Sequence, residues 1–121
     1  MSGGGESRFP PTMRLKRQRD FRQVYRDGRV WKGSPFTLHV LVQDGEKRLG
    51  IVIPRRWGNA VQRNRMKRVL REAFRRNAAR ISDVAIIAKP APAARSASID
   101  DLGEALVAAV EEIVGRREVS R

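Results

Sequence analysis

The sequence has no cysteine, one histidine and few aromatic residues. Without cysteine the chain can form no disulfide, and it has neither a thiolate nucleophile nor a cysteine ligand for zinc. His39 has no second histidine to work with, so we interpret it as an ordinary strand residue rather than part of a metal cluster or a Ser/His/Asp triad. No Gly-rich phosphate-binding loop of a common type occurs. The polypeptide alone therefore shows no catalytic centre.

Long apolar runs and acidic residues are also scarce. No run approaches the roughly 20 residues of a membrane span, and no cationic-then-apolar signal segment opens the chain, so we expect a cytoplasmic protein. The 121 residues include 26 Lys and Arg against 13 Asp and Glu, a net charge of +13. Arg outnumbers Lys, and its planar guanidinium suits phosphates and bases. This composition indicates one domain with an anionic partner. Nucleic acid is the first interpretation, and an anionic membrane surface is the second.

The most informative stretch is a basic segment in the middle of the chain. Asn59 and Gln62 form a capping-box pattern, and helical spacing of apolar residues then predicts a helix over residues 60–81. Between residues 55 and 76 there is one acid, Glu72, among nine Lys and Arg. Like charges four residues apart destabilise a helix, and a merely solvated face would mix charge signs. We therefore expect an anionic partner. The inward stripe comprises Met66, Val69, Leu70, Ala73, Phe74, Asn77 and Ile81.

The N-terminal part predicts a tail and a short helix. Residues 1–12 are Gly-rich and aperiodic, so we expect a disordered extension. Residues 17–27 indicate a helix that Gly28 closes. Phe21 and Tyr25 share a face of this helix among basic residues, a pattern typical of proteins that bind single-stranded nucleic acid. The same pattern fits an ordinary core face, which is the better interpretation from this segment alone.

Alternating apolar residues predict two strands after this helix. They span residues 36–42 and 48–53, and the Asp44-Gly45 turn signal between them predicts a hairpin. Gly50 faces away from the apolar positions of the second strand, so another group can approach the backbone closely there.

The C-terminal part predicts one more strand and one more helix. A continuous apolar run indicates an inner strand over residues 84–88. Residues 98–115 carry an apolar stripe, and from Ser96 to Val114 there are five acids and no Lys or Arg, which indicates a packing helix facing away from the partner. The order helix, strand, strand, helix, strand, helix is an α+β sandwich. We expect one domain over residues 13–115 and a flexible tail over residues 116–121.

Two segments resemble the signature of the bacterial ribonuclease P protein subunit. The first is Leu49-Gly50-Ile51-Val52-Ile53, and the second is Gly58-Asn59-Ala60-Val61-Gln62-Arg63-Asn64-Arg65-Met66-Lys67-Arg68 with its Arg-Asn-Arg core. Further likeness is found at Arg14-Leu15-Lys16, at Asp20-Phe21 with Tyr25 and Gly28, and from Asp83 to Ile87 with Lys89-Pro90. The resemblance covers about residues 13–113.

This resemblance implies both a fold and a function. The family fold packs helices around a small mixed four-stranded sheet, has an unusual left-handed strand–helix–strand crossover, and resembles a domain of a small-subunit ribosomal protein. The holoenzyme is an endoribonuclease that removes the 5′ leader of precursor tRNA. Its RNA subunit carries the active site and the catalytic Mg²⁺, and the accessory protein binds that RNA and the leader. Neither a protein-bound metal, an obligate protein partner nor a membrane is expected.

Carried over position by position, the resemblance predicts two sets of binding residues. In the leader cleft Phe21 and Tyr25 would stack on bases, which reverses the local interpretation of these rings, and His39 stands where the family often has another aromatic. The residues expected to face the catalytic RNA are Arg63, Asn64, Arg65, Lys67, Arg68 and Arg71. The residues expected to line the leader cleft are Phe21, Tyr25, His39, Arg14, Arg55 and Arg56.

Two alternatives involve no enzymatic partner. The chain could be a ribosomal-type or other structured-RNA-binding protein, or it could insert its basic helix into a groove of duplex DNA. A groove-reading helix is normally backed by a second helix, whereas strands are predicted to flank this one. A membrane-surface helix fits less well, because the apolar seam is narrow and is needed for the core.

Overall fold

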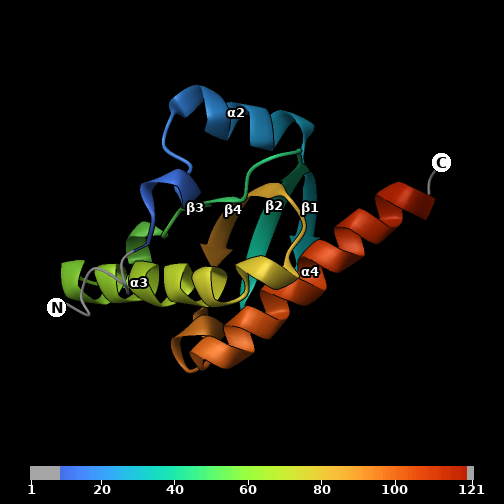
Figure 1. The fold of residues 1–121 in the computed structure, drawn as a ribbon. Coiled ribbons are helices and arrows are strands. Elements are labelled where there is room, and N and C mark those ends of the chain that lie inside the picture. Colours follow the sequence, from blue (N-terminus) through green and yellow to red (C-terminus); the bar gives the residue numbers. More distant parts are fainter. Residues whose placement is uncertain (1–8, 120–121) are drawn as a thin grey trace, which may run out of the picture.

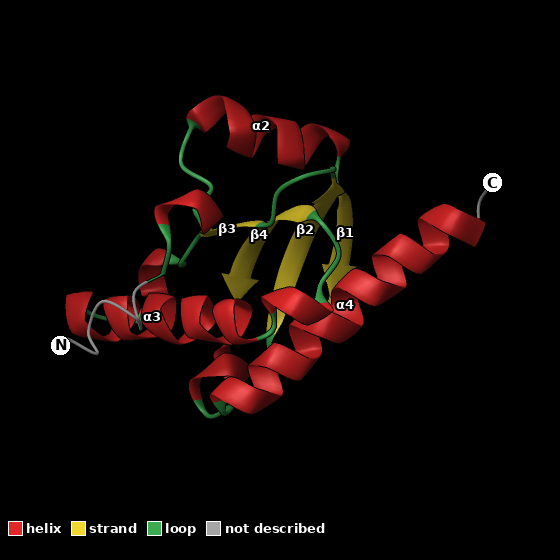
Figure 2. Cartoon of the chain, in the orientation of Figure 1, coloured by secondary structure: helices red, strands yellow, loops and turns green. Residues whose placement is uncertain are grey.

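The computed structural model describes the backbone of residues 9–119 and the side chains of residues 9–116. Helices lie on both sides of a central sheet (Figures 1 and 2). In chain order the main elements are α2 (Gln18–Asp27), β1 (Arg29–Lys32), β2 (Phe36–Val42), β3 (Arg48–Ile51), α3 (Ala60–Arg76), β4 (Val84–Pro90) and α4 (Ile99–Val119). Short 3-10 helices stand at Pro11–Met13 (η1), Arg55–Trp57 (η2), Ala78–Arg80 (η3) and Pro92–Arg95 (η4).

The four strands form one mixed sheet in the order β1-β2-β4-β3. Strand β2 is antiparallel to both β1 and β4, whereas β3 is parallel to β4. Parallel neighbours need a crossover connection, and α3 supplies it between β3 and β4. The predicted α+β architecture with a small mixed four-stranded sheet is therefore confirmed.

The predicted hairpin between β2 and β3 is wrong. Strand β4 lies between them, with Val84 opposite Val42 and Ala85 opposite Arg48. The turn itself is real: Gly45 has φ of 91°, and its N–H donates to the Asp83 carboxylate at 2.9 Å. A local turn signal thus indicates where the chain reverses, but it does not determine which strand occupies the neighbouring place in the sheet.

Strand β1 was not among the strands predicted from alternation. It has only four residues, and Arg29, Val30 and Lys32 are exposed at the sheet edge. A strand this short and this exposed carries almost no apolar periodicity, so only the family resemblance indicated a fourth strand.

The fold begins before residue 13, where the disordered extension was expected to end. Phe9 is 7% exposed and belongs to the main core, with its ring centroid 6.0 Å from that of Phe74. Residues 9–12 therefore belong to the domain, which corrects the predicted boundary. The rest of the predicted extension, residues 1–8, lies outside the described residues.

Two helix ends also differ from expectation. Helix α3 ends at Arg76 rather than Ile81, and the chain continues through η3. Helix α4 passes through Gly115 and reaches Val119, so most of the predicted tail is helical. A glycine inside a helix lowers its stability but does not by itself end it, and α4 continues through Gly115. Residues 120–121 lie outside the described residues.

The two faces of the sheet are covered differently. One face holds the main core, in which Phe36, Leu38 and Ile86 are fully buried beneath α3 and α4. On the other face α2 alone crosses β2 and β4, above a smaller cluster that includes Val24 and Ile87 (Figure 1). The second face therefore keeps strand positions at which polar and aromatic side chains can reach solvent.

Candidate nucleic-acid interface

Helix α3 is held in one orientation by its cap and by its buried stripe. The Asn59 side chain accepts from the Gln62 N–H, and the Gln62 side chain accepts from the Asn59 N–H, each at 2.9 Å. Met66, Leu70 and Phe74 are buried against the core. Since these residues fix the inward side, the remaining side chains of α3 face outward or sideways.

Five of the six residues predicted to face RNA occupy these outward and lateral positions of α3, from Asn64 to Arg71. Asn64, Arg65 and Arg68 are exposed, and Lys67 and Arg71 are half-buried. Within the part of the chain that the structure describes, no acidic side chain pairs with any of these cations. This surface, called the α3 cationic face below, displays unneutralised positive charge.

Arg14 lies near Arg71 of the α3 cationic face and does not line the pocket that contains His39. It forms a parallel bridge with Leu49 of β3 and is exposed. Burial and then the charge of Arg14 lower the pKa of the Arg71 guanidinium. Two like charges that raise each other's energy in this way are stabilised when an anion such as a phosphate approaches both.

Arg63 is the exception among the six. Its guanidinium turns inward and donates to the carbonyl oxygens of Pro54 at 2.6 Å and Ile53 at 3.2 Å. This contact ties the start of α3 to the end of the β3 segment. The helical spacing contains the signal, because Arg63 lies three residues before Met66 and seven before Leu70, on the buried stripe itself.

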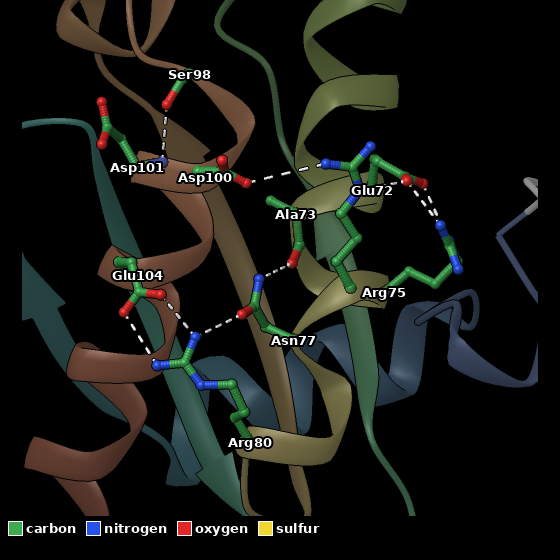
Figure 3. Close-up of polar contacts among 10 residues, drawn as sticks. Glu72, Ala73, Arg75, Asn77, Arg80, Ser98, Asp100, Asp101 and Glu104 are labelled. Atoms are coloured by element: carbon green, nitrogen blue, oxygen red, sulfur yellow. Dashed lines mark hydrogen bonds and ion pairs between the residues drawn. The ribbon is translucent and has the colours of Figure 1, made fainter.

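Beyond Arg71, the arginines of α3 and η3 are paired with carboxylates. Glu72 accepts from Arg75 at 2.7 Å and from Arg76 at 2.7 Å, and Arg80 of η3 pairs with Glu104 of α4 at 2.6 Å (Figure 3). Hydrogen bonds from Arg75 and then Arg76 lower the pKa of Glu72 to about 2. The cationic surface of α3 therefore ends near Arg71.

On the other face of the sheet, Phe21 of α2 rests on the backbone of β3. A methyl group added to Gly50 would lie 2.6 Å from Cζ of Phe21, so the ring occupies the space that a side chain would take. Phe21 is half-buried against the cluster that contains Leu15. The close approach predicted at Gly50 is confirmed, and the approaching group is this ring.

Tyr25, His39 and Lys89 form a second, more open group, called the Tyr25 cluster below. The rings of Tyr25 and His39 meet edge to face with centroids 4.8 Å apart, and Lys89 Nζ lies 4.8 Å from the Tyr25 centroid. Tyr25 is 42% exposed. Burial and then the charge of Lys89 lower the pKa of His39, so its ring is neutral at pH 7. The cluster combines stackable rings with one cation.

Arg55 and Arg56 lie on η2, and both are exposed. Arg56 lines an open pocket together with His39 and Lys89, so the structure brings it close to the Tyr25 cluster. Arg14 instead lines a separate hollow at the opposite end of β2 and β4. The predicted cleft residues thus divide between two sides of α2.

Sequence reasoning did not single out three residues of this region as site residues. Lys89 could have been found, because it is two residues after Ile87 in β4 and so lies on the same face of the sheet. Trp57 and Arg95 gave no local signal, since their contact joins segments 38 residues apart in the chain.

An α+β domain with an unneutralised helix face and an exposed cluster of rings and cations belongs to the class of RNA-binding proteins. Comparison with known proteins makes this assignment more specific. The family described as Ribonuclease P matches residues 9–114. The chain therefore belongs to the ribonuclease P protein family.

Similar proteins support this membership along most of the chain. The ribonuclease P protein component of Syntrophobacter fumaroxidans is 38% identical over 107 residues, covering 84% of this chain and 89% of that protein. The solved ribonuclease P protein of Thermotoga maritima has a TM-score of 0.71 at 29% identity and covers 83% of this chain and 96% of its own. The solved ribonuclease P protein of Staphylococcus aureus has a TM-score of 0.65 at 26% identity and covers 88% of this chain and 96% of its own.

Membership settles the predicted function at the level of the family. The chain is a protein subunit of ribonuclease P, a ribonucleoprotein endoribonuclease that processes precursor tRNA, and its partner is the ribonuclease P RNA. Among residues 9–119, no helix has the length and apolar character needed to span a bilayer.

Proposed function

We propose that this subunit holds the single-stranded 5′ leader of precursor tRNA on the Tyr25 cluster. The observation that carries the proposal is the exposed Tyr25 ring, which has His39 at its edge and Lys89 over its face. A stacked base contributes ~1–3 kcal/mol whatever its identity, because every base has a π face. Lys89 and Arg56 then supply positive charge for the leader phosphates.

We propose further that the α3 cationic face is the contact with ribonuclease P RNA. Arg65 and Arg68 are exposed without acidic partners in the described structure, and Lys67 and Arg71 flank them. Each cation that neutralises a phosphate releases counterions, so affinity falls steeply as salt rises. Both RNAs are made in the bacterial cytoplasm, and we place the subunit there.

The Mg²⁺ of the reaction belongs, in this proposal, to the RNA subunit. The protein's positive charge lowers the repulsion between that RNA and precursor tRNA, which leaves less of this work to metal ions. A bacterial ribonuclease P RNA is titrated with Mg²⁺ with and without the protein, and leader cleavage is measured. We expect half-maximal cleavage at lower Mg²⁺ with the protein present. An unchanged titration curve would contradict the proposal.

Leader binding is tested by Tyr25→Ala in the reconstituted holoenzyme. Losing one stacked base predicts roughly tenfold weaker binding of precursor tRNA with a long leader, and little change for mature tRNA. Arg26→Ala is the matched control, because Arg26 is exposed on the same helix but pairs with Asp27. Equal losses with and without a leader would exclude Tyr25 as a leader contact.

A further inference from the structure

An open pocket of about 420 Å³ lies next to the Tyr25 cluster, between η2, η4 and the ends of β2 and β4. This volume is within the ~300–1,000 Å³ typical of small-molecule sites and is large enough for one nucleotide. No acidic side chain lines it. Its cations are Arg56, Lys89 and Arg95, and rigid apolar walls come from Pro54, Pro90 and Pro92.

Arg95 is held in a defined orientation at this pocket. Its guanidinium carbon lies 4.2 Å from the ring centroid of Trp57, and Nη2 donates to the Trp57 carbonyl oxygen. Trp57 is 6% exposed, and the neighbouring Ala94 is 2% exposed, so both ends of the contact are anchored in the core. Arg95 itself stays exposed. A guanidinium stacked on an indole can stack a nucleobase on its other face.

The pocket is continuous with the Tyr25 cluster. His39 and Lys89 line the pocket, and the same two side chains contact the Tyr25 ring. Tyr25 and Arg95 therefore border one continuous surface whose shared residues are His39 and Lys89. An anionic ligand with a planar group fits this combination of three cations, one of them a stacked guanidinium, and a lining without acids.

We propose that this pocket binds one leader nucleotide, adjacent to the nucleotide on Tyr25, with its base on Arg95 and its phosphate near Arg56 and Lys89. The proposal rests on the leader-binding function above and adds Arg95 as a binding residue of that site. The three proline residues of the lining have no backbone N–H with which to donate a hydrogen bond to a base edge. The subsite therefore favours a nucleotide over an empty position but distinguishes little between bases.

The experiment compares holoenzymes that carry wild-type protein or Arg95→Ala. Their dissociation constants are measured for precursor tRNAs whose leaders lengthen one nucleotide at a time. With the wild type, affinity rises in steps as the leader reaches each subsite. Arg95→Ala is expected to lose one step of about fivefold or more and to bind shorter leaders normally. Arg95→Lys keeps the charge but not the plane, and is expected to lose most of the same step.

Arg80→Ala is the matched control, because Arg80 is an exposed arginine that pairs with Glu104 far along the chain from the pocket. It is expected to keep every step. An unchanged profile for Arg95→Ala overturns the proposal, and so does an equal loss at all leader lengths. Tyr25→Ala separates the two hypotheses. If it loses leader-dependent affinity while Arg95→Ala does not, only the subsite fails; if it loses none, the leader-binding function fails.

Thermal unfolding shows whether Arg95→Ala folds. If it does not, the wild-type holoenzyme is used with precursor tRNAs that carry one 4-thiouridine at successive leader positions. After irradiation, one position is expected to crosslink within residues 91–95, next to the position that crosslinks to α2. Crosslinks to α2 with none in residues 91–95 at any position overturn the subsite.

Discussion

The two halves of α3 contain the same kinds of residue in different surroundings. Arg65 and Arg68 in the first half have no acidic partner among the described residues, whereas Arg75 and Arg76 in the second half share Glu72. The difference is made by the positions of a few carboxylates, not by the number of arginines. A run of cations along a helix therefore does not define a binding surface until its acids have been placed.

Helix α4 contributes to this division. It was predicted to be a packing element that faces away from the partner, but its acidic side also meets α3. Asp100 lies 3.9 Å from Arg76, and Glu104 pairs with Arg80 (Figure 3). These carboxylates would repel phosphates as well as occupy the arginines. Helix α4 thus marks the edge of the surface on which we place the RNA.

The largest expected effect comes from removing cations of the first half. The double substitution Arg65→Ala and Arg68→Ala is expected to weaken binding of ribonuclease P RNA by about 10- to 100-fold and to lower the salt slope by about two. The fold should be unaffected because both side chains are exposed. Filter binding over a range of salt concentrations measures both quantities.

The matched control removes the same charge from the other side of the division. Arg76→Ala with Arg80→Ala leaves Glu72 paired with Arg75, and we expect less than about a threefold loss of affinity. If the two double variants lost equal affinity, net charge alone would explain binding, and the distinction between the halves would fail.

A smaller effect, on stability rather than affinity, is expected for Arg63→Ala. This substitution leaves the carbonyl oxygens of Pro54 and Ile53 without their partner. Hydrogen bonds from a charged group contribute ~1.5–3 kcal/mol each, and water replaces part of them at this half-buried site, so a loss of about 2 kcal/mol is expected. Urea unfolding measures it. A variant as stable as the wild type that binds RNA poorly would instead make Arg63 an RNA contact.

The smallest effect is expected from Glu72→Gln and depends on pH. The folded pKa of about 2 lies below the ordinary value of 4.5, so the ionised carboxylate stabilises the fold above about pH 4.5. That stabilisation is lost as pH falls toward 2. Because the ion pairs are partly exposed, we expect about 1 kcal/mol between wild type and variant at pH 7, shrinking below pH 4.5. A difference independent of pH would assign the effect to packing.

Local sequence patterns predicted the structural features that depend only on residues close together in the chain. The capping box of Asn59 and Gln62 and the buried stripe of α3 are present as predicted, since both follow from helical spacing alone. The hairpin prediction failed because β4 enters the sheet between β2 and β3 from more than 30 residues away. No turn signal contains that information.

The same limit applies to the candidate site. Tyr25 and His39 were predicted as cleft residues from the resemblance, and the structure brings them together. Arg63 was also predicted from the resemblance, as an RNA contact, and the structure shows its guanidinium donating to the carbonyl oxygens of Pro54 and Ile53. The contact of Arg95 with Trp57 could not be predicted, because it joins η2 and η4, two segments 38 residues apart in the chain.

Gly50 sets the clearance under α2. The ring of Phe21 sits where any larger residue would place its first carbon, and Tyr25 follows one helical turn later on the same helix. A side chain at this position would lift the ring and tilt the helix, and Tyr25 would move relative to Lys89. The absence of a side chain at Gly50 thus helps to fix the height of α2 above the sheet, and with it the position of Tyr25.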